Sequence, residues 1–236
     1  MSRTIFIFGD SHTKAIGQYF KEKVDGAHNN TYLVNYLQTE KNGNIQGDLT
    51  IDGALDLIDS LATGDLVVLS FLGTLHNILG LVKHESPFTF NYERAEMASE
   101  ELIPVAALRA TFLEKMTQNK PIRQIIERAK CRVLILSTPP PKQSNEYIAS
   151  KMSRYREHSV SIVSLNDPGN RLAMWNIEMD ALERFCESNN ITRLPPPEET
   201  INEFGFLSGE YFQNDVTHAN AFYGKKVIEM LEEMNL

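Results

Sequence analysis

The sequence predicts an α/β fold with a central, mainly parallel sheet. Short runs of β-branched and aromatic residues alternate along the chain with longer stretches whose apolar residues recur at helical spacing. The short runs are continuously apolar, which is typical of strands that are buried on both faces of a sheet. Strands that alternate with helices in this way favour a parallel sheet.

Four short apolar runs are the predicted strands. The first reads TIFIF and is ended by Gly9, which suits a buried strand followed by a turn. The last runs directly into the prolines at 139–141, where a sheet ladder cannot continue, so we expect the chain to leave the sheet there. The four strands span 4–8, 32–37, 66–72 and 132–137.

Four stretches with apolar residues near helical spacing are the predicted helices, and they span 14–24, 51–61, 170–187 and 219–234. The segment at about 83–130 differs, because it mixes the loop-like HESPFTFNYE with a largely helical-looking stretch. We interpret this segment as an insertion or cap that contains helices. No internal repeat, low-complexity tract or Gly/Ser linker marks a boundary, so we predict a single domain over 1–236.

Composition and charge exclude several classes of protein. Hydrophobic residues make up 42% and charged residues 23% of the 236 positions, which is ordinary for a globular protein and argues against disorder. The net charge of −8 argues against a surface that follows nucleic-acid phosphates, so we expect no nucleic-acid partner. The two cysteines, Cys131 and Cys186, are expected to be buried thiols rather than a disulfide framework.

The expected location is the cytoplasm. The apolar run at 4–8 is too short, and too quickly interrupted by Gly9 and Asp10, to be the hydrophobic region of a signal peptide. No other stretch is suited to a transmembrane helix, so we expect no membrane span.

The first candidate for chemistry is Ser11, which follows the first predicted strand in the sequence IFIFGDSH. Ligands of a parallel α/β sheet bind outside the carboxyl ends of its strands, and Ser11 occupies such a position. Gly9 permits a tight bend there, and amides at the start of the next helix can stabilise an anion. A serine hydroxyl is a poor nucleophile without a base, so a histidine from elsewhere in the chain is required.

The candidate base is His218, in the sequence NDVTHAN just ahead of the last predicted helix. Asp215 lies three residues earlier, a spacing at which its carboxylate can reach the imidazole and fix the tautomer. Ser11, His218 and Asp215 are therefore the predicted nucleophile, base and orienting acid. Each motif also has a structural reading, in which Asp10 and Ser11 only cap a helix and His218 is a surface residue.

The two motifs together resemble those of the SGNH superfamily of GDSL-type hydrolases, and the resemblance spans nearly the whole chain. It implies a flavodoxin-like, three-layer α/β/α sandwich with Ser11, Asp215 and His218 as the triad. It also implies a glycine and an asparagine that help to form an oxyanion hole. Gly47 stands just before the helix predicted at 51–61, where the family has its glycine, although it is equally a glycine that ends a loop.

The sequence departs from the family pattern at the asparagine. The third predicted strand is followed by FLGTLHN instead of the usual G-x-N-D. Asn77 could supply the amide if the loop is rearranged, and Thr74 or His76 could act as donors in its place. We place these residues and Asp10 among the candidate oxyanion or substrate-binding residues.

The leading functional hypothesis is a serine-dependent ester hydrolase or O-acyl (acetyl) transferase that forms an acyl-enzyme. The resemblance suggests an acylated carbohydrate as the substrate, with other small esters as an alternative. The expected partner is therefore a small-molecule or glycan ester, and we expect neither a cofactor nor a metal ion.

Two other hypotheses come from different classes of protein. In a calcineurin-like metallophosphoesterase, Asp10 and His12 would be metal ligands, but that site needs a late G-H-x-H sequence and only His218 stands there. In a catalytically degenerate SGNH module, the chain would bind a glycan or a partner without turning it over. The missing G-x-N-D motivates this third hypothesis, and the intact Ser11, Asp215 and His218 argue against it.

Overall fold

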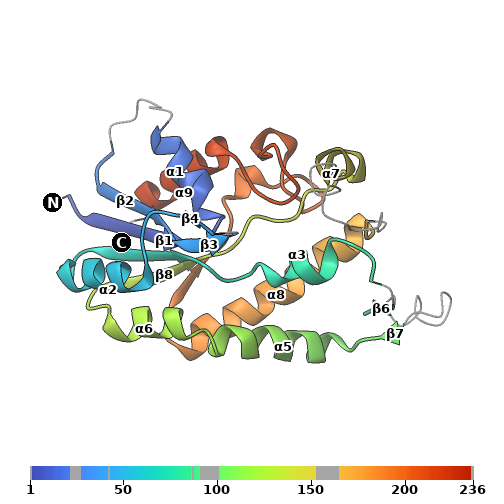
Figure 1. The fold of residues 1–236 in the computed structure, drawn as a ribbon, viewed down its shortest axis with the longest axis horizontal. Coiled ribbons are helices and arrows are strands. Elements are labelled where there is room, and N and C mark those ends of the chain that lie inside the picture. The colour runs from blue at the N-terminus through green and yellow to red at the C-terminus, as the bar shows by residue number, and fades with distance from the viewer. Residues whose placement is uncertain are drawn as a thin grey trace.

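The computed structural model describes residues 2–21, 28–41, 43–84, 86, 88–90, 101–152 and 165–234. Figure 1 shows a central sheet with helices on both faces, which confirms the predicted three-layer α/β/α sandwich. The sheet has five strands in the order β2-β1-β5-β8-β9, and every neighbouring pair is parallel. The strands are β1 (Thr4–Gly9), β2 (Thr31–Tyr36), β5 (Leu66–Ser70), β8 (Arg132–Leu136) and β9 (Thr192–Leu194).

The helices divide between the two faces of the sheet (Figure 1). One face carries α1 (Thr13–Lys21) and α9 (Ala221–Glu233), which pack on each other. The other face carries α2 (Ile51–Ser60), α5 (Val105–Thr117), α6 (Lys120–Arg128) and α8 (Pro168–Ser188).

Shorter elements complete the described part of the chain, and the sequence predicted none of them. Strands β3 and β4 form an antiparallel pair, and β6 and β7 form a parallel pair. These elements are β3 (Thr39–Lys41), β4 (Asn44–Gln46), β6 (Phe88–Thr89), β7 (Glu101–Leu102), α3 (Leu75–Gly80), α7 (Asn145–Met152), η2 (Glu198–Thr200) and η3 (Gly209–Tyr211).

The core lies on both faces of the sheet because successive side chains of a strand point in opposite directions. In β1, Phe6 and Phe8 pack into the cluster between the sheet and helices α5 and α8, whereas Ile5 and Ile7 pack against α1 and α9. All four side chains are buried, which explains the continuous apolar run that predicted this strand. Burial of each such side chain contributes about 1.5–3 kcal/mol relative to its exposure.

Helix starts are set by polar side chains that accept backbone N–H groups. Thr50 caps α2, Asn119 caps α6 and Asp167 caps α8. Asn220 caps α9 by accepting from the N–H groups of Phe222 and Tyr223. The cap at Asn220 also fixes the direction in which the preceding loop enters α9.

A glycine brings α9 close to α1. A Cβ atom on Gly224 would lie 2.2 Å from the carbonyl oxygen of Ala15, so only glycine permits this approach of the two helices. The contact holds the start of α9 near the start of α1. Ser11 lies just before α1 and His218 lies just before α9, so this contact also brings their segments together.

The segment predicted as an insertion, about 83–130, contributes α5 and α6 to the layer beneath the sheet. Phe112 of α5 and Ile122 of α6 are fully buried in the main core cluster. These two helices therefore belong to the sandwich itself. Residues 91–100 of the segment, like residues 22–24 of the helix predicted at 14–24, lie outside the described residues.

Two further expectations concern the membrane and the cysteines. Within the residues that the structure describes, no helix is long and apolar enough to cross a membrane. Cys131 and Cys186 are buried free thiols, as the sequence predicted.

Candidate active site

Ser11 lies on the turn between β1 and α1, at the carboxyl edge of the sheet. The turn is tight because a Cβ atom on Gly9 would lie 2.2 Å from the carbonyl oxygen of Ser70. Asp10 donates its backbone N–H to the same carbonyl at 3.1 Å, and Lys14 donates its N–H to the carbonyl of Ser11 at 3.3 Å. This arrangement presents the partly buried Ser11 hydroxyl beyond the end of the strand.

The structure brings Ser11, His218 and Asp215 together. The Oγ of Ser11 lies 2.8 Å from Nε2 of His218, although 207 positions separate the two residues in the sequence. Nδ1 of His218 lies 2.7 Å from Oδ2 of Asp215. Since an ionised carboxylate can only accept, the proton of the neutral imidazole belongs on Nδ1, and Nε2 is left to accept the serine proton.

The short Asp215–His218 spacing closes a compact turn. Oδ1 of Asp215 accepts the backbone N–H groups of Thr217 and His218 at 3.0 and 2.8 Å. Burial raises the pKa of the Asp215 carboxyl, but the hydrogen bonds from His218 outweigh it and hold this pKa well below its ordinary value. Asp215 is therefore ionised at neutral pH and can stabilise a cationic imidazole.

A buried lysine, Lys142, supports this turn from behind, and sequence reasoning missed it. Its Nζ donates to the carbonyl oxygens of Gln213 and Asp215 at 2.8 and 2.7 Å, and lies 3.5 Å from Oδ1 of Asp215. The only signal in the sequence was its place directly after the proline cluster that ends β8.

Gly47 lies in a left-handed conformation with φ of 109°, after β4 and four positions before the start of α2. A Cβ atom there would lie 2.4 Å from the carbonyl oxygen of Leu37, so the position requires glycine. Gly47 lines a groove with Thr13 and Lys14 of α1, which places it near the turn that carries Ser11.

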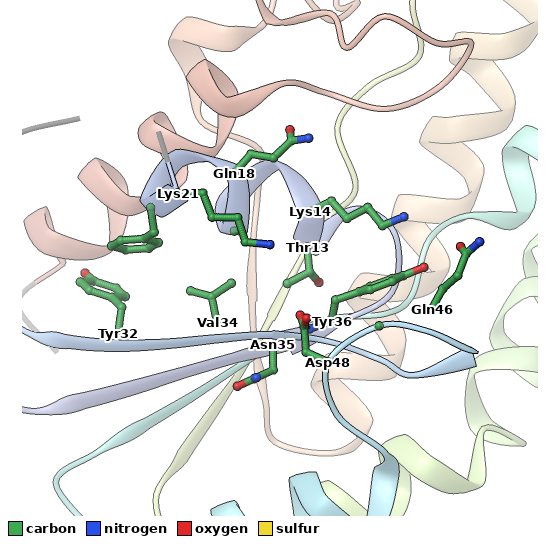
Figure 2. A pocket seen from close by; sticks show the side chains of 13 residues that line it. Thr13, Lys14, Gln18, Lys21, Tyr32, Val34, Asn35, Tyr36, Gln46 and Asp48 are labelled. Carbon is green, nitrogen blue, oxygen red and sulfur yellow. The ribbon is translucent and has the colours of Figure 1, made fainter. Parts of the chain in front are cut away.

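The groove runs between α1 and β2 and encloses about 790 Å³ (Figure 2). Figure 2 shows Thr13 and Lys21 extending from α1 towards β2, whereas Gln18 points to the opposite side of the helix. The Nζ of Lys14 lies 4.5 Å from the ring centroid of Tyr36. The lining residues are Thr13, Lys14, Gly17, Gln18, Phe20, Lys21, Tyr32, Val34, Asn35, Tyr36, Gln46, Gly47 and Asp48.

No family model and no curated protein matches the sequence, but solved structures match the fold. A carbohydrate acetylesterase family member from Sinorhizobium meliloti is 10% identical, with 98% of this chain and 95% of that chain covered and a TM-score of 0.51. An extracellular lipase from Streptomyces rimosus is 11% identical, with 98% and 100% covered and a TM-score of 0.50. This chain has the SGNH hydrolase fold.

The FLGTLHN sequence after β5 leads into α3, whose first turn is held by another residue that sequence reasoning missed. The carboxylate of Glu178, on α8, accepts the backbone N–H groups of Leu75 and His76 at 3.0 and 2.8 Å. It also lies 2.9 Å from Nδ1 of His76. Glu178 and His76 are both buried, and their contacts fix the start of α3.

The three predicted donors in this part of the SGNH fold have different surroundings. His76 is committed to Glu178, Thr74 is the partly buried residue just before α3, and Asn77 lies in its first turn. Among the described residues, none of the three has a hydrogen bond to Ser11 or His218. Their assignment as oxyanion donors stays a prediction.

Asp10 and His12 flank Ser11 and are drawn into the same site. Oδ1 of Asp10 accepts the backbone N–H of His12 at 3.1 Å. Burial raises the pKa of Asp10 to about 6, although the N–H of His12 and the charge of His218 oppose the change. The buried ring of His12 lies 5.1 Å from the ring of His218, centroid to centroid.

The metallophosphoesterase alternative needs a set of converging metal ligands. Within the described part of the chain, no group of three or more His, Cys, Asp or Glu residues could hold a metal ion. The carboxylate of Asp10 turns back to the backbone of His12 instead of pairing with its ring. The donor set of that alternative is therefore not formed by these residues.

Proposed function

We propose that the protein is a serine-dependent ester hydrolase or O-acyltransferase. The single observation that carries the proposal is the continuous chain of contacts from the Ser11 hydroxyl through His218 to the Asp215 carboxylate. These contacts supply a nucleophile, a base whose Nε2 can accept the serine proton, and a group that fixes the tautomer of the base. It stands at the carboxyl edge of a parallel sheet, where ligands of such sheets bind.

In the proposed reaction, Nε2 of His218 accepts the Ser11 proton while Oγ attacks the ester carbonyl carbon. The tetrahedral oxyanion would be stabilised by backbone N–H groups, for which Ser11 and Gly47 are the candidates. His218 then returns the proton to the leaving alcohol, which leaves an acyl group on Ser11. Water or a second hydroxyl then attacks this acyl ester and gives its proton to His218. His218 passes the proton to Oγ of Ser11 as that oxygen leaves, so the carboxylic acid or the new ester is released and Ser11 is regenerated.

We further propose that the substrate is a short acyl ester, such as an acetyl ester, of a carbohydrate. The groove between α1 and β2, whose lining begins at Thr13 just after Ser11, supports this proposal because it offers amides, ammonium groups, a carboxylate and two tyrosines. Hydroxyl-rich molecules can pair with such groups, whereas a long acyl chain would leave many of them without partners. The Sinorhizobium structure is named a carbohydrate acetylesterase and the Streptomyces structure a lipase, so these names do not favour a carbohydrate ester over a lipid ester.

The test is p-nitrophenyl acetate hydrolysis without added metal by the wild type, Ser11→Ala and His218→Ala proteins, matched for folding by circular dichroism. Both variants should lose at least about 10³-fold in kcat, as expected when a member of such a triad is removed. Activity that persists in both variants would refute the triad. EDTA-sensitive phosphodiesterase activity would favour the metal alternative instead.

The substrate proposal has its own test. Acetylated oligosaccharides should be turned over with a higher kcat/KM than p-nitrophenyl esters of long fatty acids, and Ser11→Ala should abolish both activities. Adding a sugar acceptor separates hydrolysis from transfer, because a transferase would form the acylated sugar. A preference for long acyl chains would contradict the carbohydrate assignment while leaving the triad intact.

A further inference from the structure

We propose that Lys142 is a positioning residue of the active site, whose buried ammonium group holds the 213–218 loop so that Asp215 and His218 face Ser11. The inference rests on the proposed function, because it assigns a role within that site. The hydrogen bonds of the Lys142 ammonium group go to Gln213 and Asp215, not to the Ser11 hydroxyl or the His218 ring. Its effect on the site is therefore carried through Asp215.

The backbone around Lys142 is anchored from two sides. The carbonyl of Pro141 accepts the N–H of Leu207 at 3.2 Å, and the carbonyl of Lys142 accepts from the guanidinium of Arg171 at 3.1 Å. Arg171 is itself buried on α8. The lysine thus extends from a fixed point beyond the end of β8 towards the 213–218 loop.

The ammonium group meets acceptors that all belong to this loop. An ammonium has three N–H groups and no acceptor, and here the carbonyls of Gln213 and Asp215 and the Asp215 carboxylate surround it. The loop is closed further by the N–H of Gln213, which donates to the carbonyl of His218 at 3.0 Å. Because these contacts converge on one cation, the loop conformation depends on it.

Two aromatic rings complete the enclosure. The Nζ of Lys142 lies 5.0 Å from the ring centroid of Tyr147 and 5.0 Å from that of Phe212. The Tyr147 hydroxyl donates to the carbonyl of Gln213 at 2.7 Å, so it braces the same loop without adding a charge. Rings at this distance attract a desolvated cation.

The two members of the Lys142–Asp215 ion pair differ in exposure to solvent, which indicates that the buried lysine anchors the loop. The Lys142 side chain is 0% exposed, whereas that of Asp215 is 31% exposed. A buried cation is stable only with compensating partners, and removal of one partner of such a pair is strongly destabilising. The loop carbonyls and the carboxylate supply this compensation, so the cation and the loop conformation stabilise each other.

The charge of Lys142 responds to pH near neutrality. Burial lowers the pKa of Lys142 to about 8, Asp215 opposes the change by its charge and its hydrogen bond, and Lys151 on α7 adds to it. Arg171 contacts Lys142 through the backbone carbonyl of the lysine and not through its ammonium group. His218 is bonded to the other carboxylate oxygen of Asp215. The cation is therefore lost as the pH rises through about 8, and turnover should decline in the same range.

The test compares Lys142→Met, which keeps the side-chain length without the amine, with Tyr147→Phe, which removes a neutral donor to the same loop. Both are assayed with p-nitrophenyl acetate between pH 6 and pH 10. Lys142→Met should lower kcat by roughly 10–100-fold, as a small misplacement of catalytic groups does, while KM changes less than about 3-fold. The variant should also lose the alkaline decline of kcat, which Tyr147→Phe should retain.

A second measurement needs neither substrate nor a well-folded variant. In the wild type, the NMR signal of the His218 Nδ1 proton should be sharp at pH 7 and broadened by exchange above about pH 8 to 9. A signal that stays sharp to pH 10, or a Lys142→Met protein with wild-type kcat and pH profile, would overturn the proposal. Wild-type activity that survives Ser11→Ala would instead refute the proposed function, and the NMR signal would still decide the role of Lys142.

Discussion

Asp10 and His12 stand on either side of Ser11, and burial shifts their pKa values in opposite directions. Burial raises the pKa of Asp10 to about 6 and lowers the pKa of His12 to about 3, because in each case it penalises the charged form. His12 is therefore neutral wherever the protein is folded at ordinary pH. Asp10 is charged at neutral pH only at a cost in stability.

Asp10→Asn should raise the free energy of unfolding at pH 8 but not at pH 3 to 4. The carboxyl pKa rises from 3.8 to about 6 on folding, so the folded state binds the proton more tightly. Stability is lost as the pH rises between these values and stays lower above them, by up to about 3 kcal/mol. Urea unfolding at both pH values measures the effect, and an equal change at both would contradict it.

Helices α3 and α9 each owe their position to a close contact with another helix. Gly224 lets the backbone of α9 approach Ala15 on α1. Glu178 on α8 accepts the first two N–H groups of α3 and holds His76. Both contacts lie near the active site, so changes in helix packing should reach the residues around Ser11.

Gly224→Ala should destabilise the protein by about 1–3 kcal/mol, the usual cost of overpacking. The new methyl group would lie 2.2 Å from the Ala15 carbonyl oxygen. Gly17→Ala on α1 is the matched control, because the nearest atom to its Cβ is Val34 Cγ1 at 3.9 Å. The control should be neutral or stabilising by up to about 1 kcal/mol, since alanine favours helix. Thermal unfolding of both variants would test this, and equal losses would contradict it.

Glu178→Ala should cost roughly 3–5 kcal/mol in the free energy of unfolding, because it leaves His76 and two N–H groups without their buried partner. Glu178→Gln, which keeps an acceptor oxygen of similar shape, should lose less than Glu178→Ala. Denaturant unfolding ranks the three proteins. A Glu178→Ala protein as stable as the wild type would show that α3 does not depend on this carboxylate.

At the scale of the whole molecule, one sheet is shared by two core clusters. The single tryptophan, Trp175, lies in the cluster beneath the sheet, and Leu231 of α9 lies in the cluster above it. The three central strands, β1, β5 and β8, send alternate side chains into the two clusters. The two layers should therefore unfold together rather than one after the other.

Leu231→Ala should lower the melting temperature by roughly 5–15 °C, given the cost of a buried cavity and the size of the domain. The shift should be the same whether unfolding is followed by Trp175 fluorescence or by far-UV circular dichroism, because the layers are coupled. A fluorescence transition that stays at the wild-type temperature while the circular dichroism transition moves would show that the layers unfold independently.

The sequence predicted the elements whose signal is local. Continuous apolar runs marked β1, β2, β5 and β8, and the Asp215–His218 spacing marked a turn that the structure closes by hydrogen bonds. Lys142 and Glu178 were missed because their partners lie 71 to 103 positions away and no periodicity links them. Short polar strands such as β3 and β4 have no buried face, so no hydrophobic pattern in the sequence predicted them.

The 2.8 Å contact between residues 207 positions apart has a consequence for a cleaved chain. A cut between the two residues would leave one fragment with the nucleophile and the other with its base and acid. Neither fragment would be competent alone, so regained turnover on mixing would report reassembly of the sandwich. The pairing of β1 with β5 and the packing of α1 on α9 are the surfaces on which complementary fragments could reassociate.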